Sequence, residues 1–268
     1  MTAHIHYKKS ILNKKLSNYI FFVDEEFDTV RLKNQLSSGE YSFIRDILKT
    51  KDLKKEILAI DISSKRKIIL VSLKKNQKNS DLENLGAKFY DLFKDSKQNE
   101  YSLNTDAMPL KFRNFVGYFL HGLKLKSYKF EKYKTKKSNK KINIFVSGKN
   151  KPSSNDQIKF RAIEEGTFYT RDLVSEPGNI LHPDEYAKRL NLLKKDGLKI
   201  NIYDEKKLKK LGMNTLLGVG QGSIRGSYLV TIEWNGLNNK SKPLAFVGKG
   251  VCFDTGGISL KPAKFMED

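Results

Sequence analysis

The chain of 268 residues has little of several features that define other classes of protein. Its single cysteine, Cys252, excludes an internal disulfide framework and favours a reducing, cytoplasmic location. No apolar run approaches the roughly 18 residues that a membrane-spanning helix needs, and no apolar segment follows the charged N-terminus as in a secretory signal. We therefore expect a cytoplasmic protein without a membrane segment.

Arginine is also scarce, although the formal net charge is +21. Only eight of the 51 basic residues are arginine, the side chain that binds phosphates and base edges in a bidentate way. The lysines are spread along the chain, and 124–141 is the one basic cluster. The charge thus indicates a solvated, lysine-rich surface. Nucleic acid is not an expected partner, and weak binding to polyanions through this cluster stays open.

What is present is enough for a folded α/β protein of about two domains, with 38% hydrophobic residues and a mean hydropathy of -0.55. In the first half, patterns of apolar residues predict strands at 17–24, 65–75 and 141–148 and helices at 39–52, 82–96 and 113–130. In the helix at 82–96, Leu85, Phe89 and Leu92 are expected on one buried face. Strands that alternate with helices predict a mostly parallel sheet covered on both faces.

Residues 148–156 combine Gly, Pro, Ser, Asn and Asp, which is typical of a linker. We therefore predict two domains, 1–150 and 151–268. In the second, a helix is expected from Asp156 to about Ser175, because Pro177 disfavours the helical conformation of the residue before it. Another helix is expected over 182–197, with Pro183 near its start. A short helix is expected at 205–212, and strands are expected at 198–204, 227–234 and 243–250.

The last of these predicted strands opens into the most informative segment, VGKGVCFDTGGISLKP, residues 247–262. Its glycines permit tight turns and close approach to a ligand. Asp254 is a hard oxygen donor suited to a divalent metal ion, and Lys249 is a possible ligand only as a neutral amine. Lys261 is suited to stabilise negative charge on a substrate oxygen.

Residue types alone leave another interpretation open, in which Asp254 caps a turn and both lysines are solvated. A phosphate-binding loop is a third interpretation, but neither GxxxxGK[ST] nor a helix-opening GxGxxG occurs here.

The segment resembles the metal-binding segment of the leucyl aminopeptidase family, also called cytosol aminopeptidases. Two further segments resemble motifs of the same family, in the same order: RDLVSEPGNILHP at 171–183 and LGMNTLLGVGQGS at 211–223. The region GYFLHGLKLKSYKFEKYKT is similar to a helix late in the family's N-terminal domain. The resemblance implies an N-terminal macro-like α/β domain followed by the first part of an α/β catalytic domain.

The resemblance also implies the chemistry of the site. Lys249 and Asp254 would bind two divalent metal ions, Mn or Zn, and Lys261 would act as the catalytic residue that stabilises the oxyanion. The substrate would be a peptide with a free N-terminus, preferably beginning with an apolar residue such as leucine. The family assembles as hexamers, and a bicarbonate ion takes part in its reaction.

The remaining family ligands would follow Asp268, so the chain is expected to be a C-terminally truncated form that is inactive alone. Two alternatives remain from other classes: a nucleic-acid-binding protein, and a noncatalytic remnant that acts through its N-terminal domain.

The chain departs from the family motifs at two single residues. These are Cys252, where Thr is common in the family, and Ser175, where Asn is common. For Cys252 we favour a small buried filler over a metal thiolate. For His182, before Pro183, we favour a local hydrogen bond over metal ligation.

Overall fold

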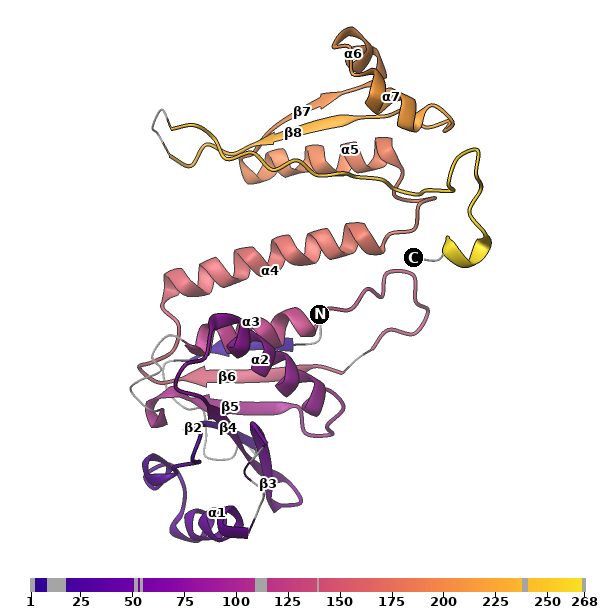
Figure 1. Ribbon diagram of the computed structural model, residues 1–268. Helices are drawn as coiled ribbons and strands as arrows, with labels where there is room; N and C mark the ends of the chain where they lie inside the picture. The colour runs from indigo at the N-terminus through magenta and orange to yellow at the C-terminus, as the bar shows by residue number, and fades with distance from the viewer. Residues whose placement is uncertain are drawn as a thin grey trace. The chain divides into compact units, whose positions relative to one another are not determined.

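The structure is a computed structural model, and it describes residues 3–8, 18–50, 53, 55–108, 115–138, 140–237 and 241–266. The chain divides into two compact units, Met1–Asp172 and Leu173–Asp268 (Figure 1). The first residues of the predicted helix at 113–130, and Asp268, lie outside the described residues. Among the described helices, none has both the length and the apolar character that a bilayer crossing requires.

The N-terminal unit is built on a six-stranded sheet with strand order β1-β6-β5-β2-β4-β3. Its strands are β1 (Ala3–Tyr7), β2 (Asn18–Asp24), β3 (Ile57–Ser63), β4 (Arg66–Leu73), β5 (Glu100–Asn104) and β6 (Ile142–Ser147). All neighbouring pairs are parallel except β3 and β4, which are antiparallel. The predicted strands at 17–24, 65–75 and 141–148 are confirmed as β2, β4 and β6, within a mostly parallel sheet.

Helices cover both faces of this sheet, as the alternation of elements predicts. The helix α1 (Ser38–Thr50) lies on one face, and α2 (Asn79–Phe93) and α3 (Phe115–Lys126) lie on the other. The unit also contains α4 (Ser154–Ser175) and the short 3-10 helices η1 (Val30–Leu32) and η2 (Thr105–Ala107). Successive side chains of β2 enter two separate cores, because side chains alternate between the faces of a strand. Ile20 and Phe22 pack in the core that contains α2 and α3. Tyr19 and Phe21 pack in the core that contains Ile44 of α1.

The prediction that Leu92 lies on the buried face of α2 is wrong. Leu85 and Phe89 are buried, but Leu92 is 61% exposed. Phe93, which follows Phe89 by four residues and so lies on the same helix face, takes the buried position instead. The sequence pattern allowed either spacing, and the packing against Tyr101 of β5 selects Phe93.

The long helix α4 packs on the N-terminal unit. Phe160 meets the ring of Tyr118 on α3 edge-on, with centroids 5.2 Å apart. His121 Nδ1 lies 3.2 Å from Glu164 Oε1, and both side chains are buried. The two compact units therefore divide in the last turn of α4, at Asp172–Leu173, whereas linker composition placed the boundary at 150/151. The division of the family domains at 151 stays a prediction.

The C-terminal unit contains a two-stranded antiparallel sheet of β7 and β8. Its elements are α5 (Pro183–Asn191), η4 (Leu192–Asp196), β7 (Lys199–Tyr203), α6 (Glu205–Lys210), α7 (Asn214–Gly220), β8 (Leu229–Glu233) and η5 (Ala263–Phe265). The helices predicted at 156–175, 182–197 and 205–212 are confirmed in outline as α4, α5 with η4, and α6. The strands predicted at 198–204 and 227–234 are confirmed as β7 and β8.

The strand predicted at 243–250 is wrong. These residues carry no regular secondary structure, and Leu244, Phe246 and Val247 are 81%, 90% and 100% exposed. An apolar run becomes a strand only when another strand pairs with its backbone. In the part of the chain that the structure describes, the second sheet holds β7 and β8 alone, so the run stays extended and unpaired.

Candidate functional site

Asp254 and Lys261, two of the three residues singled out from the sequence, lie in contact. Lys261 Nζ is 3.0 Å from Asp254 Oδ2. The backbone N–H of Gly256 donates to Asp254 Oδ1 over 2.8 Å. A tight turn makes this possible, because Gly256 adopts φ +93° and the N–H of Lys261 donates to the carbonyl of Thr255 over 2.8 Å. Both carboxylate oxygens are thus held within one short loop.

These contacts favour the ionised form of Asp254. The hydrogen bond from the Gly256 backbone lowers the pKa of this carboxyl, and the hydrogen bond and charge of Lys261 lower it further. The charge of Lys249 acts in the same direction. The side chain of Lys249 is itself exposed to solvent.

Asp254 and Lys249 could supply some of the ligands of a metal site, but they are too few to supply all of them. Asp254 is exposed and anionic, which suits a hard divalent cation. Lys249 adds one amine, whereas a structural or catalytic zinc ion takes about four ligands. Among the described residues, no three His, Cys, Asp or Glu side chains are grouped so that they could hold a metal ion. The assignment of Lys249 and Asp254 as metal ligands stays a prediction.

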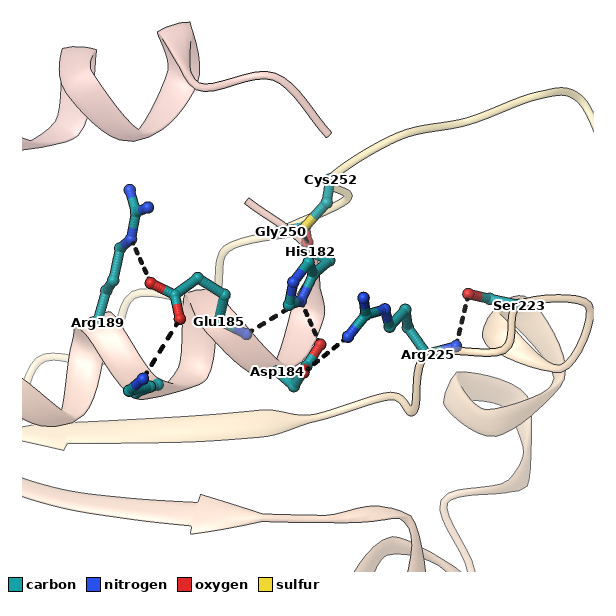
Figure 2. A network of polar contacts seen from close by, with 9 residues as sticks. His182, Asp184, Glu185, Arg189, Ser223, Arg225, Gly250 and Cys252 are labelled. Atoms are coloured by element: carbon teal, nitrogen blue, oxygen red, sulfur yellow. Dashed lines mark hydrogen bonds and ion pairs between the residues drawn. The ribbon is translucent and has the colours of Figure 1, made fainter. Parts of the chain in front are cut away.

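His182 has the local role that the sequence favoured. It is the N-cap of α5, and its Nδ1 lies 3.4 Å from the backbone N of Glu185. The same Nδ1 contacts the carboxylate of Asp184, and Asp184 Oδ2 in turn lies 3.2 Å from the Arg225 guanidinium (Figure 2). The predicted local hydrogen bond is confirmed, and it fixes the start of α5.

Cys252 lies close to this same start of α5 (Figure 2). Its side chain is half-buried, and its Sγ contacts the carbonyl oxygen of Gly250 at 3.9 Å. Partial burial raises the pKa of the thiol, and the carboxylate of Asp184 raises it further. These surroundings favour the neutral thiol over the thiolate that a metal ligand needs. They agree with Cys252 as a small, partly buried filler.

The segment at 171–183 is tied to α5 by an ion-pair network. Arg189 donates to Glu176 Oε1 over 3.0 Å and to Glu185 Oε1 over 2.9 Å. Glu176 is almost fully buried, with its side chain 2% exposed. The segment that the sequence singled out by resemblance is therefore anchored through a charged side chain that motif reasoning did not identify.

Comparison with known proteins supports the family resemblance of this region. A family model described as "Cytosol aminopeptidase family, catalytic domain" matches residues 168–268. This confirms the resemblance drawn from the three sequence motifs.

Curated relatives of the family share close to half of the aligned residues. A "Probable cytosol aminopeptidase" of Brucella suis is 49% identical over 155 residues, which is 55% of this chain and 31% of the relative. Another from Caulobacter vibrioides is 49% identical over 156 residues, again 55% of this chain and 31% of the relative. The alignments thus span about a third of the length of these relatives.

Solved structures of aminopeptidases have a similar fold. A tomato leucine aminopeptidase mutant gives a TM-score of 0.75 at 19% identity, over 94% of this chain and 55% of that one. Cytosol aminopeptidase from Coxiella burnetii gives 0.69 at 21% identity, over 97% and 52%. The bottromycin maturation enzyme BotP, solved in complex with Mn, gives 0.66 at 21% identity, over 93% and 51%. The predicted α/β fold class, with its two parts, is confirmed.

Proposed function

We propose that this chain is part of a metal-dependent aminopeptidase that releases N-terminal amino acids, preferably apolar ones such as leucine, from peptides. The observation that carries the proposal is the contact between Asp254 and Lys261 inside the region that matches the family's catalytic domain. A carboxylate suited to a metal ion and an ammonium suited to an oxyanion are thereby adjacent, an arrangement compatible with peptide hydrolysis at a metal centre.

The roles of the chain's own residues follow from this arrangement. Asp254 would hold metal through its carboxylate, and Lys249 would hold metal through its amine. When bound, two Mn or Zn ions would polarise the scissile carbonyl and lower the pKa of a water molecule. Lys261 would stabilise the negative charge that develops on the carbonyl oxygen of the substrate. The BotP structure with Mn supports manganese as one candidate.

The remaining properties are proposed for the whole protein from its family. It acts in the cytoplasm on peptides with a free N-terminus, assembles as a homohexamer and uses a bicarbonate ion in proton transfer. The name of its relatives, cytosol aminopeptidase, and the single cysteine support the proposed location.

We further propose that residues 1–268 alone do not hydrolyse peptides. One carboxylate and one amine are too few to hold two divalent ions, since about four ligands are usual for each. Purified residues 1–268 should show no hydrolysis of leucine p-nitroanilide, with or without added Mn²⁺ or Zn²⁺. Metal-dependent turnover by this chain would refute the proposal of inactivity.

A chimera tests the proposed function itself. The aligned residues of the Brucella suis relative are replaced by the matching residues of this chain, so that the relative supplies the rest of the catalytic domain. The chimera should hydrolyse leucine p-nitroanilide, lose activity with a chelator and regain it with Mn²⁺. The substitution Asp254→Asn should lower kcat at least 100-fold, while Asp196→Asn, at an exposed carboxylate, should leave kcat within twofold. Full activity of the Asp254→Asn chimera would contradict the proposed role.

The alternative of nucleic-acid binding gains no support from the basic cluster at 124–141. Lys126 lies 3.0 Å from Asp91 Oδ2, and Lys140 lies 2.7 Å from Asp95 Oδ1. Carboxylates thus neutralise part of the cluster. Filter binding at two salt concentrations tests the alternative, which requires salt-sensitive binding at physiological ionic strength.

A further inference from the structure

Two glycines in the C-terminal unit lie where an added Cβ would be in tight contact with another chain segment. A Cβ placed on Gly178 would lie 3.0 Å from the Cβ of Phe253 and 3.3 Å from the carbonyl oxygen of Cys252. A Cβ placed on Gly250 would lie 3.0 Å from Cε1 of Tyr186. Neither glycine has a positive φ, so the reason for glycine is close approach and not an unusual backbone conformation.

The two contacts join the segments that carry the proposed metal ligands and the start of α5. Gly178 precedes α5, and Tyr186 lies on α5. Gly250 directly follows Lys249, and Phe253 directly precedes Asp254. The contacts therefore lie between the two proposed ligands, each directly beside one of them. Figure 2 shows Gly250 and Cys252 beside His182 at the beginning of α5.

We propose that Gly178, Gly250 and Tyr186 position the segment 249–254 by holding it against α5. The segment forms no strand, so hydrogen bonds to a neighbouring strand do not fix its place within the described residues. Close contact with α5 replaces them. The helix is itself fixed by the His182 cap and by the Arg189 ion pairs, so it offers a rigid support. This inference rests on the proposed function, because the placement affects hydrolysis only if Lys249 and Asp254 hold metal.

Cys252 reports on this placement without any metal, because it lies between the two contacts and is the single cysteine of the chain. Its half-buried thiol is expected to react slowly with iodoacetamide while the segment is held against α5. Gly178→Ala and Tyr186→Ala should each raise the alkylation rate of native residues 1–268 at least fivefold. Tyr186→Phe, which keeps the ring that faces Gly250, should restore the slow rate of the unchanged chain.

Gly248 provides a matched control within the same segment. A Cβ on Gly248 would meet nothing within 4 Å, and its φ is not positive. Gly248→Ala should therefore leave the alkylation rate within about twofold, whereas Gly250→Ala should raise it. Thermal melting of each variant, followed by circular dichroism, confirms that the chain is folded at the temperature of the assay.

A double-mutant cycle separates a direct contact from general loosening. If the added methyl of Gly250→Ala meets the Tyr186 ring, its effect on alkylation should disappear when Tyr186 is already alanine. Independent, multiplicative effects in the double variant would overturn the proposed contact. Unchanged alkylation in both Gly178→Ala and Tyr186→Ala would overturn the proposal as a whole.

The chimera distinguishes failure of this inference from failure of the proposed function. In an active chimera, Tyr186→Ala should raise the Mn²⁺ concentration for half-maximal hydrolysis at least fivefold, and Tyr186→Phe should not. An active chimera with an unchanged Mn²⁺ requirement would leave the function intact and refute the positioning role. An inactive chimera with the expected alkylation pattern would refute the function and leave the contacts standing.

Discussion

At the scale of single residues, local chemistry and burial decide what each polar side chain does. The pKa of Asp254 is lowered because a backbone N–H and Lys261 contact its carboxylate. His182 caps a helix because its ring nitrogen reaches the backbone N–H of Glu185. Residue type alone left a turn cap open for Asp254 and a metal ligand open for His182. The hydrogen bond from Gly256 makes Asp254 a turn cap, and the contacts of His182 Nδ1 among the described residues are all local.

Tyr7 allows a prediction on stability at alkaline pH. Burial raises the pKa of Tyr7 to about 12, and the charge of Glu164 contributes. The unfolded chain ionises this phenol near its ordinary pKa of about 10, so the folded state loses stability as pH rises between about 10 and 12. The substitution Tyr7→Phe should reduce this pH-dependent loss in the free energy of unfolding by up to about 3 kcal/mol. Urea unfolding at pH 9 and pH 11.5 measures it; an identical pH dependence in both proteins would contradict the prediction.

At the scale of helices and strands, hydrophobic patterns found the central elements and missed the shorter ones. The apolar runs of β2 and β4 are long enough to identify buried strands. β5 carries only Tyr101 and Leu103 as buried apolar residues within EYSLN, yet it lies between β2 and β6. The run at 243–250 has a stronger apolar pattern and forms no strand. Strand formation depends on a pairing partner from elsewhere in the chain, which a local pattern does not contain.

The packing of α2 against α3 gives a prediction at this scale. A Cβ on Gly122 would overlap the backbone of Glu83 on α2, so the two helices approach more closely than a side chain permits. Gly122→Ala should lower the free energy of unfolding by about 1–3 kcal/mol, because the helices must separate.

The matched control is Gly166→Ala in α4, where a Cβ would meet nothing within 4 Å. It should raise the free energy of unfolding by up to about 1 kcal/mol through helix propensity. Equal effects of the two substitutions in urea titrations would show that close packing at Gly122 does not matter.

At the scale of the whole molecule, α4 decides where the first compact unit ends. Its residues Phe160, Glu164 and Phe168 contact α3 and the residues just after it. A linker read from composition at 148–156 therefore precedes a helix that still belongs to the N-terminal unit. Composition identifies where the chain can turn, but not which unit the following helix covers.

Two fragments test this division. Residues 1–175 retain α4, while residues 1–150 lose it and expose the face of α3 that carries His121 and Tyr118. The longer fragment should melt roughly 5–10 °C higher, since it keeps a buried helix interface worth about 2–3 kcal/mol. Equal melting temperatures in calorimetry would contradict the assignment of α4 to the N-terminal unit.

The sequence by itself determined the alternation of strands and helices, the lysine-rich surface and the family motifs around Lys249, Asp254 and Lys261. These are properties of local spacing, which the chain carries in any conformation. Only the tertiary structure decided the strand order, the place of α4 and the close approach of Gly178 and Gly250 to residues distant in sequence. Such contacts depend on which segments the packing brings together, and the packing is a property of the whole chain.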